Sequence, residues 1–165
     1  MSFLGDLFGS RKYIAVEYDI PTQIKLRQWC IDNGFDLRTK FNGETQATEE
    51  FDFHTTVFYS SSKHFMKNKE ITFLKPYEAK VTGIKNLGRD PLKPIPTLTV
   101  ESDTLNYLRD DFSQLYNMKD EWTNYIGHVT ISYNGIRSTP IHLINKLPDF
   151  NLYFNKLKIA DVKEY

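Results

Sequence analysis

Hydrophobic and polar residues alternate along several short segments, which is the pattern of half-buried β-strands. Residues 12–18 are the clearest case, with Ile14, Val16 and Tyr18 at every second position. Enrichment in β-branched and aromatic residues extends the prediction to six further segments. These predicted strands cover residues 51–59, 70–74, 77–85, 96–101, 125–133 and 152–163.

Helical spacing of apolar residues predicts three helices between these strands. The first covers 22–33 and ends at Asn33-Gly34, a favourable helix stop. The second begins at Ser102 or Asp103, which can cap its first turn. A short third helix is predicted at about 139–147, starting near Pro140.

The predicted order mixes strands joined by turns with a few helices, which is typical of an α+β fold with a mainly antiparallel sheet. The polar segment 38–50 and the proline-containing segment 85–96 are expected to be loops. No long Pro/Gly/Ser-rich stretch divides the chain of 165 residues, so a single domain is expected over residues 1–165.

Composition narrows the class of protein. The chain is 40% hydrophobic and 15% aromatic, which excludes a disordered or low-complexity protein. Lys plus Arg and Asp plus Glu both total 21, so a binding partner such as long nucleic acid, which needs a basic surface, is not expected. Cys30 is the sole cysteine and can form neither an internal disulfide nor a zinc cluster. No apolar run is long enough to cross a membrane, so we expect a cytoplasmic protein without a membrane partner.

Two predicted strands carry the same short motif. His54-Thr55-Thr56-Val57 and His128-Val129-Thr130-Ile131 are both H-x-T followed by an apolar residue. The composition alone would give this pattern to two of the four histidines in only about 2% of sequences. The duplicated motif is therefore the main functional signal in the chain.

Side chains two residues apart in a strand point to the same face. The motif therefore places an imidazole beside a hydroxyl on one face of each strand. These faces are expected to carry His54, Thr56 and Phe58 in one strand and His128, Thr130 and Ser132 in the other. The opposite, apolar faces would carry Phe53, Thr55, Val57 and Tyr59, and Val129, Ile131 and Tyr133.

Two imidazoles and two hydroxyls around one point suit cleavage of a phosphodiester. Imidazole titrates near neutrality, so one histidine can accept a proton while the other donates one. The hydroxyls of Thr56 and Thr130 can hydrogen-bond the phosphate oxygens as negative charge develops there. This chemistry requires no metal ion or other cofactor, and we expect none.

The tandem H-x-T strands, which begin their motifs at His54 and His128, resemble those of the 2H phosphoesterase superfamily. The segments Phe-His-Thr-Thr-Val-Phe-Tyr-Ser and Gly-His-Val-Thr-Ile-Ser-Tyr look most like phage anti-CBASS cyclic-oligonucleotide phosphodiesterases. The resemblance implies a bilobed fold, with two antiparallel-sheet lobes, helices on the outside and a central cleft. Gly127 departs from the family pattern, which has an apolar residue before the second histidine.

The resemblance also implies an activity. A metal-independent phosphodiesterase of this kind would hydrolyse cyclic di- or trinucleotide second messengers to linear products and so block host CBASS antiphage signalling from the host cytoplasm. An RNA 2′,3′-cyclic or 2′,5′-linked phosphodiesterase is the alternative within the enzyme class. A cyclic-nucleotide sponge that binds without cleaving is the alternative outside it. The apolar N-terminal segment permits an oligomer but does not require one.

Four further residues are candidates for binding the substrate. Tyr13 should share the cleft-facing side of its strand with Glu17, where it can stack on a base or simply cover the sheet. Trp122 precedes the second motif and can be a platform for a base or a packing residue. The resemblance allows Asp161 or Glu164 to accept an amino proton of adenine, although a solvated carboxylate is the simpler interpretation.

Overall fold

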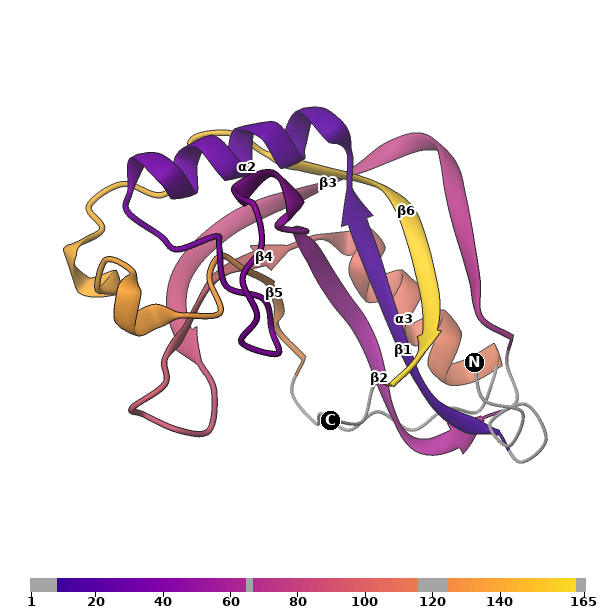
Figure 1. The fold of residues 1–165 in the computed structure, drawn as a ribbon. Coiled ribbons are helices and arrows are strands. Elements are labelled where there is room, and N and C mark those ends of the chain that lie inside the picture. Colours follow the sequence, from indigo (N-terminus) through magenta and orange to yellow (C-terminus); the bar gives the residue numbers. More distant parts are fainter. Residues whose placement is uncertain (1–8, 65–66, 116–124, 163–165) are drawn as a thin grey trace.

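A computed structural model describes residues 9–64, 67–115 and 125–162, shown in Figure 1. Six strands form one antiparallel sheet in the order β2-β1-β6-β3-β4-β5, which confirms the predicted α+β class. The strands are β1 (Ser10–Tyr18), β2 (His54–His64), β3 (Lys69–Leu87), β4 (Ile95–Glu101), β5 (Gly127–Thr130) and β6 (Leu152–Asp161). Two α-helices, α2 (Ile20–Asp32) and α3 (Asp103–Leu115), and short 3₁₀ turns at Thr48–Glu50, Gly135–Arg137 and Ile141–Leu143 join them.

Strand β3 corrects the prediction of two separate strands at 70–74 and 77–85. It runs without interruption over 19 residues and pairs first with β6 and then with β4. The register shifts between Thr72 and Tyr77, where Pro76 interrupts the sequence pattern. Proline has no N–H for the ladder, so the register shift lets the strand continue past it.

The first two predicted helices are confirmed, and the third is wrong. Asp19 caps α2 by accepting a hydrogen bond of 3.0 Å from the Thr22 N–H, so the helix starts two residues earlier than predicted. The predicted helix at 139–147 is only the single 3₁₀ turn Ile141–Leu143. Its proline-flanked segment is too short to sustain an α-helix. Neither described α-helix has the length and apolar character needed to cross a membrane.

One apolar core joins the sheet to both helices. Ile14 and Val16 of β1 are fully buried, as their alternation predicts, and pack in the same cluster as Leu26 of α2 and Leu105 of α3. Figure 1 shows α3 behind β1, with α2 across one end of the sheet. The helices and the apolar side of β1 therefore belong to the core, which leaves the polar side of β1 for other contacts.

The sheet is curved so that its outermost strands approach each other. The Tyr125 hydroxyl, two residues before β5, donates a hydrogen bond of 2.8 Å to the Thr56 carbonyl of β2. Arg109 of α3 donates a hydrogen bond of 2.9 Å to the neighbouring Val57 carbonyl. These contacts join α3 and the segment before β5 to the edge strand β2 and bring the two histidine motifs together.

Candidate active site

A pocket of about 430 Å³ opens on the polar side of β1 and β2. It lies within the range of volumes usual for small-molecule sites. Its walls combine the first motif, the polar residues of β1 and β6, and residues from the loops and the second motif. They comprise Tyr13, Ala15, Glu17, Phe41, Asp52, His54, Thr56, Tyr59, Thr130, Tyr133, Lys158, Ala160, Asp161 and Val162.

The structure thus brings together most of the predicted site residues that it describes. Tyr13, His54, Thr56, Thr130 and Asp161 all contribute to the wall. His128 is half-buried next to Thr130 on β5, outside the lining itself, but near enough for its charge to interact with that of His54. Trp122 and Glu164 lie outside the described residues.

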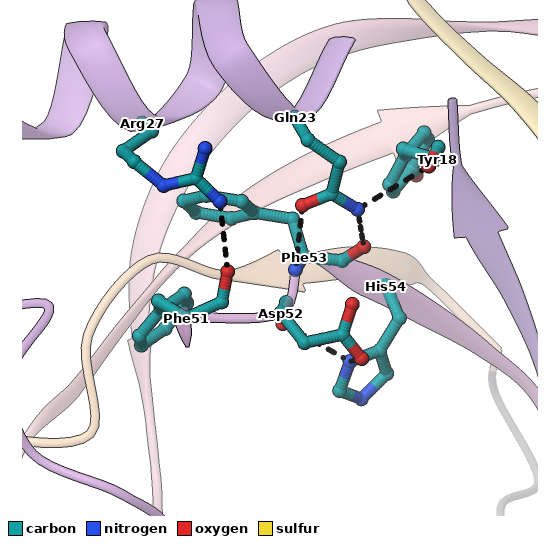
Figure 2. A network of polar contacts seen from close by, with 7 residues as sticks. All are labelled: Tyr18, Gln23, Arg27, Phe51, Asp52, Phe53 and His54. Atoms are coloured by element: carbon teal, nitrogen blue, oxygen red, sulfur yellow. Dashed lines mark hydrogen bonds and ion pairs between the residues drawn. The ribbon is translucent and has the colours of Figure 1, made fainter. Parts of the chain in front are cut away.

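Helix α2 holds the segment that leads into β2 and so positions His54 (Figure 2). The side-chain amide of Gln23 accepts from the Phe53 N–H at 3.1 Å and donates to the Phe53 carbonyl at 2.7 Å. Arg27 donates to the Phe51 carbonyl at 3.3 Å. Both backbone groups of Phe53 are bound to Gln23 of α2. The backbone that leads into His54, the first residue of β2, is therefore held in place.

A β-bulge in β2 corrects the predicted faces of this strand. Ala15 pairs with Thr56 but Ile14 pairs with Phe58, so Val57 and Phe58 are both buried. Phe58 therefore joins the core, and Tyr59 turns to the pocket. Simple alternation predicted the reverse, because one extra residue exchanges the two faces beyond it.

The second motif also departs from strand alternation, at the residues that follow its threonine. Strand β5 ends at Thr130, and Ser132 is fully buried, with its hydroxyl bonded to that of Ser138 at 3.0 Å. Tyr133 lines the pocket and also packs against the core. Ser132 therefore lies beyond the strand, and the predicted shared face ends with His128 and Thr130.

Gly127 allows close packing before the second histidine. A Cβ atom at this position would lie 3.1 Å from both the carbonyl oxygen and a methyl group of Val100. The absence of a side chain therefore lets β5 lie close against β4 at this point. The glycine affects packing and leaves the positions of His128 and Thr130 in the strand.

Both imidazoles are oriented by the same local contact. His54 Nδ1 lies 3.3 Å from the Asp52 carbonyl, and His128 Nδ1 lies 3.2 Å from the Ile126 carbonyl, in each case two residues before the histidine. A carbonyl oxygen only accepts, so Nδ1 must carry the proton in both rings. In the neutral form, Nε2 of each ring is then the basic nitrogen available to a ligand.

The charges around the two imidazoles differ. The Asp52 carboxylate lies 3.7 Å from His54 Nδ1. Burial lowers the pKa of His128, and the positive charges of Lys85 and His54 lower it further, against the hydrogen bond to Ile126. His128 is therefore biased toward the neutral, proton-accepting form.

Tyr13 and Glu17 line the pocket beside the first motif, as alternation along β1 predicts. The Tyr13 hydroxyl hydrogen-bonds Thr56, and burial is the main reason why the pKa of Tyr13 is raised, so the group stays neutral. Its ring meets that of His54 edge-on, with 6.2 Å between centroids. Burial and the negative charge of Asp52 raise the pKa of Glu17. In the β1–β2 ladder, Glu17 lies directly across from His54.

The carboxylate of Asp161 is occupied by neighbouring side chains. It accepts hydrogen bonds from Lys12 at 2.6 Å, from Asn68 at 3.2 Å and from the Ser10 hydroxyl. Burial opposes ionisation, but these hydrogen bonds prevail and lower the pKa of Asp161 to about 2. Its place in the pocket wall is compatible with substrate contact, while its hydrogen bonds give it a structural role as well.

Strand alternation did not predict that Tyr59 and Tyr133 line the pocket, although the sequence contains a signal for both. Both motifs continue as H-x-T-x-x-Y, ending at Tyr59 and Tyr133, and both tyrosines line the pocket. The alignment of two lysines with the motif threonines was not predicted either. Lys158 lies in a cross-strand row with Ala15 and Thr56, and Lys85 in a row with Thr97 and Thr130.

Lys85 was expected at the start of a loop but lies within β3, where Thr97 donates to its carbonyl at 3.0 Å. Each motif threonine therefore has a lysine two strands away on the same face of the sheet. Cross-strand pairing, which brings these residues into line, is not visible in the sequence.

Among the described residues, no three His, Cys, Asp or Glu side chains gather closely enough to hold a metal ion. None of the known protein-family models matches the sequence, and a search of curated proteins finds no relative. The functional argument consequently depends on the geometry of the site and on the motifs.

Proposed function

We propose that this protein is a metal-independent phosphodiesterase of the 2H type that hydrolyses cyclic di- or trinucleotide second messengers to linear products. One observation carries the proposal. Two H-x-T motifs, from opposite ends of the sheet order, meet at one pocket that both threonines line, with the two histidines close enough to interact. A bilobed 2H fold and a role in blocking CBASS antiphage signalling are the finer parts of the same proposal.

In the proposed reaction, His128 acts as base in the first step. Its Nε2 takes the proton of a ribose 2′-hydroxyl, and the resulting oxygen attacks the adjacent 3′–5′ phosphodiester. His54, whose Nδ1 lies 3.7 Å from the Asp52 carboxylate, acts as the acid and donates a proton to the leaving 5′-oxygen. The Thr56 and Thr130 hydroxyls stabilise the charge on the phosphate oxygens.

The cyclic 2′,3′-phosphate formed in the first step is then opened by water with the histidine roles exchanged. His54, now neutral, accepts the proton of the water, and His128 returns a proton to the ribose oxygen. Each step leaves the pair of histidines with the same total number of protons. The cycle therefore requires neither a metal ion nor an external base.

The direct test is incubation of the purified protein with 3′,3′-cGAMP in excess EDTA, followed by chromatography and mass spectrometry. We expect conversion to a linear phosphorylated dinucleotide and its loss in His54→Ala and His128→Ala. Survival of the dinucleotide with the wild-type chain would refute this substrate, and 2′,3′-cyclic and 2′,5′-linked nucleotides would then be tested. Thermal stabilisation by 3′,3′-cGAMP without any product would instead support a sponge.

A further inference from the structure

An aromatic pair forms one wall of the pocket and has no part in the proposed proton transfers. The rings of Phe41 and Tyr133 both line the pocket, with centroids 5.6 Å apart and planes at 78°. Tyr133 also packs on the buried ring of Phe51, with 5.6 Å between centroids. The core thus fixes Tyr133, and its ring forms a corner with that of Phe41.

Phe41 is presented to the pocket by a small, ordered hairpin. Its side chain is 62% exposed, although it is fully apolar. The Lys40 N–H bonds the Glu44 carbonyl at 2.8 Å, the Gln46 N–H bonds the Arg38 carbonyl at 2.8 Å, and Gly43 turns the chain with a φ of 87°. The backbone therefore holds the ring out over the pocket instead of letting it fold onto the core.

The pocket wall also carries a second aromatic group, around the first motif. Tyr13 and Tyr59 have ring centroids 6.4 Å apart, and Tyr13 also meets His54 edge-on. His54 and the hydroxyls of Thr56 and Thr130 line the same pocket as both aromatic pairs. A ligand that carries two flat, uncharged groups and a phosphate matches this set of side chains.

We propose that Phe41 and Tyr133 form a second nucleobase-binding site, complementing a first base at Tyr13. The inference depends on the proposed function and specifies its substrate class as a nucleotide with two bases on one phosphate-containing ring. A base stacked on the face of one ring meets the edge of the other, an arrangement that aromatic pairs favour. Stacking tolerates any base, so this site selects for the presence of a second base rather than for its identity.

The consequence is a preference that separates substrates by size. A cyclic dinucleotide can occupy both aromatic groups, whereas a nucleoside 2′,3′-cyclic phosphate has only one base. Loss of Phe41 should therefore weaken binding of the dinucleotide through KM and leave kcat nearly unchanged, because the ring makes no contact with the reacting atoms.

The experiment uses the wild-type chain and its Phe41→Ala, Phe41→Trp and Tyr107→Ala variants. Tyr107 is similarly exposed, at 69%, but lies on α3 and does not line the pocket, so it is the matched control. The ligand is a 3′,3′-cyclic di-2′-deoxynucleotide with 2-aminopurine as one base. It lacks the attacking 2′-hydroxyl, and its fluorescence is quenched when the base stacks.

We expect Phe41→Ala to raise the dissociation constant about tenfold and to lose part of the quenching. Phe41→Trp should retain both, and Tyr107→Ala should match wild type. On 3′,3′-cGAMP, Phe41→Ala should raise KM by a similar factor. Equal affinity and quenching in wild type and Phe41→Ala would overturn the second base site and leave the proposed function intact. If wild type neither binds the analogue nor cleaves 3′,3′-cGAMP, the proposed function fails and the second site with it.

Discussion

The two motif strands are alike in their local structure and different in their surroundings. In both, an imidazole Nδ1 donates to the carbonyl two residues back, a threonine lies two residues on, and a tyrosine five residues on lines the pocket. Yet β2 has 11 residues and pairs with β1, whereas β5 has only four and pairs with β4. The same short sequence therefore generates the same local geometry in two different settings.

The surroundings assign different charges to the two halves. Beside His54 lies the carboxylate of Asp52, while His128 is affected by Lys85. The half around β1 and β6 is braced by the ion pair between Lys12 and Asp161, at 2.6 Å, and the half around β5 by the neutral hydroxyls of Ser132 and Ser138. The two copies of the motif therefore differ in the charged groups around them, with a carboxylate near one imidazole and a lysine near the other.

The largest effect should come from removing either imidazole. We expect His54→Gln and His128→Gln each to lower kcat on 3′,3′-cGAMP by at least about 10³-fold, because each removes a proton transfer from both steps. Steady-state kinetics in EDTA measure the loss. His142→Gln, at an exposed position, serves as the control. Activity that survives in one of the two variants would show that the reaction does not require both histidines.

Replacing the threonines sharpens the comparison next. Thr56→Val and Thr130→Val preserve volume but remove a hydroxyl from the phosphate site, so kcat should fall about 10²-fold in each. Thr56 is hydrogen-bonded to the Tyr13 hydroxyl. Tyr13→Phe should therefore be non-additive with Thr56→Val and additive with Thr130→Val in double-mutant cycles. Additivity in both cycles would contradict the proposed coupling.

The ionic brace of the first half should be visible in stability. The side chain of Lys12 is only 5% exposed, and Asp161→Asn leaves its ammonium without a counter-charge. The free energy of unfolding should therefore fall by about 2 kcal/mol, the usual contribution of a hydrogen bond between charged groups. Urea denaturation at pH 7 measures this, with exposed Asp149→Asn as the control.

The same brace predicts a dependence on pH. The folded pKa of Asp161 is about 2, below its ordinary value of 3.8, so the folded state binds protons less readily than the unfolded state. Its contribution to stability is complete above pH 3.8 and is lost as the pH falls through about 2. In Asp161→Asn this acid-dependent loss should shrink, and an unchanged profile would argue against the brace.

The smallest effect concerns the charge near the second histidine. Lys85→Gln removes a positive charge that lowers the pKa of His128, so that pKa should rise. If His128 is the base, the acidic limb of the kcat/KM profile should move to higher pH, and kcat/KM on that limb should fall about twofold. High salt should reduce the difference. Lys146→Gln, which is exposed, should leave the limb in place.

Local sequence determined the class of fold and the chemical groups of the site. Alternation predicted β1 and its buried face of Ile14 and Val16, and helix-end signals predicted α2 and α3, because these properties depend on neighbouring residues. The H-x-T spacing likewise placed each imidazole beside its hydroxyl, since residues i and i+2 share a face within one strand.

Tertiary structure decided what lies across from those groups. The bulge that directs Phe58 to the core and Tyr59 to the pocket depends on the pairing of β2 with β1. The two predicted strands at 70–74 and 77–85 form the single strand β3 because it pairs with both β6 and β4. Phe41 reaches the pocket by way of its hairpin, and Lys85 and Lys158 align with the motif threonines through strand register. Such contacts join residues distant in sequence, so their geometry arises only when the sheet curves and closes its edges around the pocket.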